Sequence, residues 1–283
     1  MKKSGVLILI VITVLSARVV LAGSWSVQNS GTTTDLFSVC FVDANNGWAV
    51  GNDGLILHTS NGGIIWEVQE SKSIRPLFSV CFVDQKNGWI GAERSILHTT
   101  DGGINWESKW LDCYLTCVYF TDLNNGWATG AFGDGIIFHT SDGGKSWIAQ
   151  TTVAETDFYG LPGVHFINST MGWAVGAGGV ILHTSNGGRT WGTQTSGTDE
   201  WLQSVYFTDS KNGWISGGRS VLHTNDGGIT WGTQTIPEEI SVHGIHFIGS
   251  TTSWITGGGG KILHTTNGGE IWNIQDSGTD NSL

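Results

Sequence analysis

Short apolar runs and polar turn clusters repeat along the chain in blocks of about 40 residues. In residues 36–69, an apolar run at 36–41 ends in a cluster rich in Asn, and three more short runs follow at 48–51, 55–59 and 66–69. Each run has the length of a strand and is bounded by Asn, Asp or Gly, which favour tight turns. No run in the block has the 3.6-residue period of a helix. The pattern predicts four short antiparallel strands, here called A to D, in each block.

Each block closes with a turn box, which reads His-Thr-Ser-Asn-Gly-Gly-Ile-Ile-Trp at 58–66. Five later copies end at intervals of 40, 41, 44, 40 and 41 residues. A fixed period of this length indicates a repeat protein. A four-stranded sheet cannot bury both of its faces alone, and such sheets stack as blades around an axis. We therefore predict an all-β β-propeller with six four-stranded blades, or seven with one blade incomplete.

One propeller domain is expected over residues 23–283. Residues 25–28 resemble a fourth strand, so an extra N-terminal strand is expected to pair into the last blade and remove an exposed edge. The six repeats are expected at about 36–69, 77–109, 115–150, 161–194, 202–234 and 242–275.

Residues 1–22 have the composition of a secretory signal peptide. Lys2 and Lys3 precede an apolar core at 6–15, and Ala22 ends a small-residue cleavage site. The apolar core is shorter than the ~20 residues of a membrane-spanning helix. We expect an exported protein without membrane insertion after cleavage, located in the periplasm or outside the cell, or in the thylakoid lumen of a phototroph.

Composition narrows the classes of partner. The chain has 13 basic and 24 acidic residues and a net charge of −11, with no basic run. Nucleic acids and anionic membranes require clustered Lys and Arg, so neither is expected as a partner. The four cysteines leave two readings open, buried thiols or the bridges Cys40–Cys81 and Cys113–Cys117.

The turn boxes are expected to be structural. Their Asp or Asn side chains accept hydrogen bonds from backbone N–H groups two residues further on, and the tryptophan anchors the turn. Half of the copies carry Asn, which argues against a calcium site; neither a metal nor a cofactor is predicted. The box residues are Asn61, Trp66, Asp101, Trp106, Asp142, Trp147, Asn186, Trp191, Asp226, Trp231, Asn267 and Trp272.

Two further sets of residues recur at fixed positions. Strand C carries one histidine in each block, and a structural role is expected because each lies in a different blade. The first strand carries a Cys, Tyr or His at one position of each block, and a metal or ligand site formed by these residues stays open as an alternative. The strand C set is His58, His98, His139, His183, His223 and His264, and the first-strand set is Cys40, Cys81, Tyr119, His165, Tyr206 and His246.

The repeat resembles that of a known family. The pattern Phe-x-Asp-x-x-x-Gly-Trp, then Ile/Val-Leu-His-Thr, then Asp/Asn-Gly-Gly-x-Thr-Trp, as in residues 207–231, is similar to the photosystem II assembly and stability factors, and to the wider Asp-box or bacterial neuraminidase repeat. The resemblance implies a non-catalytic propeller that binds a protein partner. It also implies an arginine-rich patch in photosynthetic members; this chain has no arginine cluster in its sequence, so a role outside photosynthesis is expected.

Catalysis is not predicted. A sialidase needs three converging arginines and a tyrosine nucleophile paired with a glutamate, and no Tyr/Glu pair is evident. A glycan-binding or glycan-cleaving propeller is the alternative function. The D–A and B–C connections vary most between blocks, and binding residues concentrate on such loops. The candidate partner-binding residues there are Arg75, Arg94, Trp110, Phe132, Phe158, Tyr159, Trp201 and Arg219.

Overall fold

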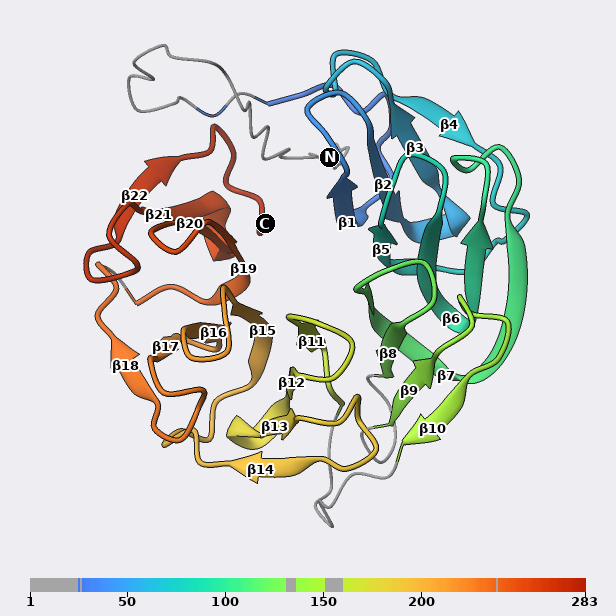
Figure 1. Cartoon of the computed structure of the whole chain (residues 1–283). Coiled ribbons are helices and arrows are strands. Elements are labelled where there is room, and N and C mark those ends of the chain that lie inside the picture. Colours follow the sequence, from blue (N-terminus) through green and yellow to red (C-terminus); the bar gives the residue numbers. More distant parts are fainter. Residues whose placement is uncertain (1–24, 26, 131–135, 151–159, 238) are drawn as a thin grey trace. The chain divides into compact units, whose positions relative to one another are not determined.

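The computed structural model describes residues 25, 27–130, 136–150, 160–237 and 239–283. These residues form five antiparallel sheets (Figure 1). The first sheet contains β1 (Leu36–Phe41), β2 (Gly47–Gly51), β3 (Ile56–Thr59) and β4 (Glu67–Gln69). The second contains β5 (Leu77–Phe82), β6 (Gly88–Thr99), β7 (Glu107–Phe120), β8 (Gly126–Gly130), β9 (Ile137–Thr140) and β10 (Ile148–Gln150).

The remaining three sheets have four strands each. They contain β11 (Gly163–Phe166), β12 (Gly172–Val175), β13 (Ile181–Thr184) and β14 (Gly192–Gln194); β15 (Leu202–Phe207), β16 (Gly213–Gly217), β17 (Ser220–Thr224) and β18 (Gly232–Gln234); and β19 (Val242–Ile248), β20 (Thr252–Gly257), β21 (Lys261–Thr265) and β22 (Asn273–Asp276). In all five sheets, strands that are neighbours in the sequence are also neighbours in the sheet.

The prediction of six blades, or seven with one incomplete, is wrong. The fold is an all-β propeller of five blades, because the second and third sequence repeats share one six-stranded sheet in the order β10-β9-β8-β7-β6-β5. Each of the other repeats forms one four-stranded sheet.

The joined sheet has a local cause in the sequence. In the first repeat, the B–C turn is a 3-10 segment, Asn52–Gly54, in which Gly54 has φ +70°. A Cβ atom at Gly54 would lie 1.9 Å from the Ser73 carbonyl, so only glycine fits. The second repeat has Glu93, Arg94 and Ser95 instead, and β6 continues through them with a shift of register.

The D–A connection of the second repeat also differs. In the first repeat, the Ser71 hydroxyl hydrogen-bonds to the Ser73 carbonyl and turns the chain after β4. Ser196 and Ser277 make the equivalent bond. Residues 110–115 contain no serine or glycine, so β7 runs without interruption from the second repeat into the third.

Aromatic stacking packs neighbouring repeats together within each unit. The strand B tryptophan Trp48 lies 3.6 Å, centroid to centroid, from Phe82 of the following repeat, and Trp127 and Trp173 lie 3.5 and 3.4 Å from Phe166 and Phe207. All three tryptophans are buried. Large aromatic rings in contact supply much of the apolar area that stabilises a core.

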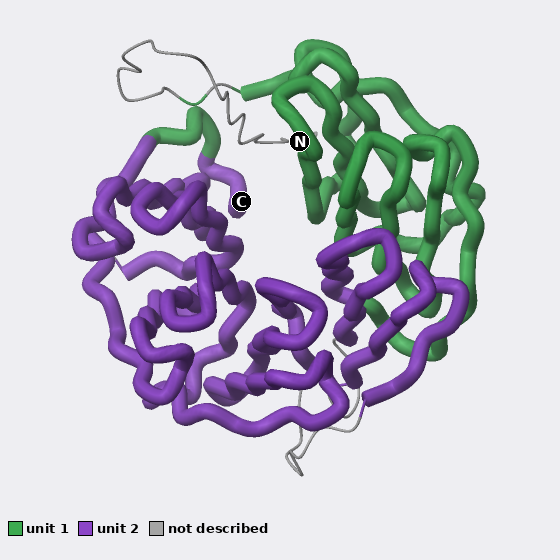
Figure 2. Tube along the Cα trace, viewed as in Figure 1, with its two compact units in different colours: residues 1–115, 276–279 green, residues 116–275, 280–283 purple. Residues whose placement is uncertain are grey.

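The chain divides into two compact units (Figure 2). Unit 1 comprises residues 1–115 and 276–279, and unit 2 comprises residues 116–275 and 280–283. Within the described part of the chain, no helix is long and apolar enough to cross a membrane.

The expected N-terminal elements are only partly represented. The signal peptide at 1–22 lies outside the described residues. The strand expected at 25–28 is reduced, among its described residues, to a single bridge at Gln28, whose side-chain amide donates to the Gly62 carbonyl at 3.4 Å.

Candidate functional site

The turn boxes are closed by their own polar groups. In the first box, the Thr59 hydroxyl donates to Asn61 and accepts from the Gly63 N–H, and Asn61 accepts from the Ile65 N–H at 2.9 Å. All six boxes repeat these bonds. The Asp or Asn was expected to accept from the backbone N–H two residues further on, and this is wrong. The backbone N–H that donates to it lies four residues further on. The N–H two residues after the Asp or Asn donates to the threonine hydroxyl instead.

The box tryptophans connect neighbouring repeats. The indole N–H groups of Trp191, Trp231 and Trp272 donate to glutamines that end strand D of the preceding repeat, Gln150, Gln194 and Gln234. Two of these glutamines, Gln150 and Gln194, also donate to the first glycine carbonyl of the following box. The sequence analysis did not identify these glutamines as partners of the indole N–H groups.

The strand C histidines lie against the strand B tryptophans. Ring centroids are 4.8 Å apart for Trp48 and His58, and 4.9 Å apart for Trp173 and His183. Burial lowers the pKa of His58 and of His183, which keeps both rings neutral. The described residues contain no group of three or more His, Cys, Asp or Glu side chains arranged to hold a metal ion.

Four members of the first-strand set form a row of aromatic rings within unit 2, Tyr119, His165, Tyr206 and His246. Centroids are 5.0 Å apart for Tyr119 and His165, 4.6 Å for His165 and Tyr206, and 5.1 Å for Tyr206 and His246. Burial, followed by the charge of His246, lowers the pKa of His165 to about 3. The described cysteines form no disulfide, so neither suggested bridge is present.

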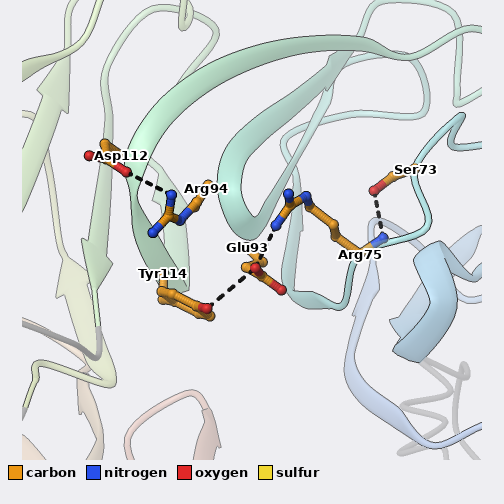
Figure 3. Close-up of polar contacts among 6 residues, drawn as sticks. All are labelled: Ser73, Arg75, Glu93, Arg94, Asp112 and Tyr114. Carbon is orange, nitrogen blue, oxygen red and sulfur yellow. Dashed lines mark hydrogen bonds and ion pairs between the residues drawn. The ribbon is translucent and has the colours of Figure 1, made fainter.

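Three candidate residues, Arg75, Arg94 and Trp110, belong to a polar cluster in unit 1. The cluster is composed of Arg75, Glu93, Arg94, Trp110, Asp112 and Tyr114. Figure 3 shows all of these except Trp110. The Arg75 guanidinium pairs with the Glu93 carboxylate, which also accepts a hydrogen bond from the Tyr114 hydroxyl at 3.3 Å. The Arg75 backbone N–H donates to the Ser73 hydroxyl. Glu93 lies on β6. It thus links Arg75, in the D–A connection between β4 and β5, to Tyr114 on β7.

Arg94 forms the second half of the polar cluster. Its guanidinium lies 3.5 Å from the Asp112 carboxylate, and its Cζ lies 6.0 Å from the centre of the Trp110 ring. The Trp110 side chain is 59% exposed, which leaves a large aromatic surface open to a partner. The cluster therefore presents two arginines and a tryptophan, with two carboxylates that orient the arginines.

The irregular pairing of β6 and β7 builds the polar cluster. Glu93 lies opposite Tyr114 and Ser95 opposite Trp110, with a shift of register between the two pairs. Arg94 lies at this shift with φ +61°, a left-handed conformation that is uncommon for residues other than glycine. The shift directs Glu93 and Arg94 toward different partners.

The other candidates lie elsewhere in the chain. Trp201 and Arg219 belong to unit 2; the Trp201 side chain is 48% exposed, and Arg219 pairs with Glu239 at 3.2 Å. The Trp201 carbonyl lies against Gly217, two residues before Arg219. Phe132, Phe158 and Tyr159 lie outside the described residues.

Sequence reasoning missed the partners of the arginines. It found no Tyr/Glu pair, whereas Tyr114 and Glu93 are hydrogen-bonded. It also placed Arg94 in a turn, whereas the residue lies within β6. The sequence does contain a sign of this arrangement, because glycine is absent at 93–95 and serine is absent at 110–115. Without these turn residues, β6 and β7 continue as long strands that carry Glu93, Arg94 and Tyr114.

The five sheets of tandem repeats and their tryptophan-anchored boxes define the chain as a repeat β-propeller. The family model for the photosynthesis system II assembly factor YCF48 matches residues 17–117, 111–196 and 193–277. The chain belongs to this family. Comparison with curated proteins gives no match.

Solved structures agree on the fold. A structure described as YCF48 bound to D1 peptide is 24% identical, with a TM-score of 0.73 over 92% of this chain and 88% of that one. YCF48 from Cyanidioschyzon merolae is 22% identical, with a TM-score of 0.69 over 85% and 84%. An ancestral GH74 enzyme is 15% identical, with a TM-score of 0.74 over 90% of this chain and 39% of the enzyme.

Proposed function

We propose that this chain is an exported, non-catalytic propeller that binds a partner protein and acts as an assembly scaffold outside photosynthesis. The polar cluster carries the proposal, because tryptophan and arginine dominate the energetics of protein interfaces. Membership of an assembly-factor family and the likeness to a YCF48 bound to a peptide support it.

The arginines favour a partner other than the photosynthetic one. Arg75, Arg94 and Arg219 each pair with a carboxylate, so these side chains form no free cationic patch. With a net charge of −11, the chain suits a partner that is recognised by aromatic contact and directed hydrogen bonds rather than by strong charge attraction.

The proposal is tested by capture of partners from an envelope extract of the source organism, followed by mass spectrometry. Trp110→Ala and Arg94→Ala should each lower recovery of the captured protein at least tenfold, as expected for interface hot spots. Ile229→Ala, at an exposed box position, is the control. Recovery unchanged by both substitutions would contradict the proposed surface. Binding of the D1 peptide with the same sensitivity would contradict a role outside photosynthesis.

Glycan cleavage is the second candidate, because Tyr114 and Glu93 are hydrogen-bonded. A tyrosine paired with a glutamate is the nucleophile of sialidases. A sialidase also needs three converging arginines. In the described residues of this chain, Glu93 is paired with Arg75 and with no second arginine. We expect no turnover of fluorogenic sialosides or other glycosides. Turnover that Tyr114→Phe abolishes would establish an enzyme instead.

A further inference from the structure

A second site lies in unit 2, between the third and fourth sequence repeats. A cleft of about 870 Å³ separates the box and strand D of the third repeat from the box of the fourth. Polar groups from both repeats line it, including Ser141, Gln150 and Ser185. The cleft is large enough for a small ligand or for a few residues of a peptide.

Arg189 is the one charged side chain among the residues that line the cleft, if the neutral His139 is set aside. Arg75, Arg94 and Arg219 are paired with carboxylates, whereas Arg189 has no ion-pair partner among the described residues. It is also exposed. A guanidinium without a partner is available to an anion.

His139 supplies the second observation. Its Nε2 atom is buried and has no hydrogen-bond partner within the described part of the chain. The ring lies against Trp127, 4.9 Å between centroids. Burial, followed by the charge of Arg189, lowers its pKa, so the ring is neutral. Because this atom is buried, a ligand does not reach it, but the ring lines the cleft and its NMR signal reports on a ligand bound there.

The cleft also departs from the repeat pattern in its charge. The A–B turns of four repeats carry an aspartate, whereas the fourth repeat has Asn168 there, and its box has Asn186. The nearby carboxylates of Asp122 and Asp142 do not line the cleft and accept hydrogen bonds within their own turns. The hydroxyls of Ser141, Ser169 and Ser185 line it and form no side-chain hydrogen bond with the described residues.

We propose that this cleft binds a carboxylate. Arg189 supplies the balancing positive charge, and the hydroxyls of Ser141, Ser169 and Ser185 donate hydrogen bonds. One guanidinium matches the single charge of a carboxylate. The ligand is either an acidic side chain within a peptide or a small free carboxylic acid. The site is independent of the polar cluster in unit 1, since no residue is shared.

The test is a titration of the full chain, followed by imidazole NMR signals, with three probes. These are acetyl-Gly-Asp-Gly-amide, its Asn counterpart, and acetate. The His139 signal, assigned by its loss in His139→Gln, should shift with acidic probes and not with the Asn peptide. Arg189→Gln should weaken binding at least tenfold, while Lys145→Gln, which removes the same charge at the equivalent box position of the third repeat, should not.

The two acidic probes distinguish the sources of the carboxylate. Binding of the Asp peptide alone identifies a peptide ligand, and binding of acetate identifies a small acid. The proposal is overturned if neither acidic probe binds, or if Arg189→Gln binds as the wild type does. Because Arg189 is exposed, its replacement is expected to leave the folded structure intact, and thermal unfolding of the variant checks this.

Discussion

At the scale of single residues, the structure places the His165 side chain in the packed interior of unit 2. His165 is 7% exposed, lies between Tyr119 and Tyr206, and accepts a hydrogen bond from the Phe207 N–H through Nδ1. Its surroundings disfavour the charged ring, because burial removes water and His246 adds like charge. The recurrence of ring residues at this position suggested a ligand site; the stacking accounts for it without a ligand.

His165 should make folding sensitive to acid. Its pKa of about 3 in the folded protein lies below the ordinary 6.5, so the unfolded chain binds a proton first and stability falls as the pH drops from 6.5 toward 3. In His165→Asn, the slope of unfolding free energy against pH should decrease by up to about 1.4 kcal/mol per pH unit. Urea unfolding at stepped pH measures this. Tyr206→Phe should keep the wild-type slope; an unchanged slope in His165→Asn would contradict the assignment.

At the scale of strands, the sequence predicted the short elements well. The turn clusters place the ends of β1 and β14 where the structure has them, because Asn, Asp and Gly follow these strands closely. β6 and β7 were not predicted, since each was expected as two strands. Their length follows from absent turn residues, and an absence is harder to recognise than a motif. The polar cluster lies on these two strands, so its geometry was missed for the same reason.

The strand D glutamines provide a test of how repeats are joined. Gln194 donates to the Gly227 carbonyl at 2.9 Å and accepts from the Trp231 indole at 3.4 Å. Gln194→Leu removes both bonds and leaves two partners unsatisfied, so the free energy of unfolding should decrease by about 1–3 kcal/mol. Urea unfolding followed by tryptophan fluorescence measures the change. Thr193→Val, an exposed neighbour on β14, should change stability little. Equal effects of the two substitutions would argue against the inter-repeat role.

At the scale of the whole chain, the count of repeats and the count of sheets are different quantities. The sequence contains six turn boxes, but the joined β5–β10 sheet reduces the blades to five. The predicted binding residues also separate by unit, with Arg75, Arg94 and Trp110 in unit 1 and Trp201 and Arg219 in unit 2. Sequence spacing alone could not group them, because it does not show which connections approach each other.

Export is the remaining prediction for the whole chain. We expect the protein, expressed in a Gram-negative host, to be recovered from the periplasm with Gly23 as its first residue. The apolar core after Lys2 and Lys3 has the pattern of a secretion signal, and Ala22 is the expected last residue before cleavage. N-terminal sequencing of the periplasmic fraction measures this. Ala22→Arg should block cleavage, since signal peptidases require a small residue there, and leave a larger precursor. Recovery of uncleaved wild-type protein from the cytoplasm would contradict export.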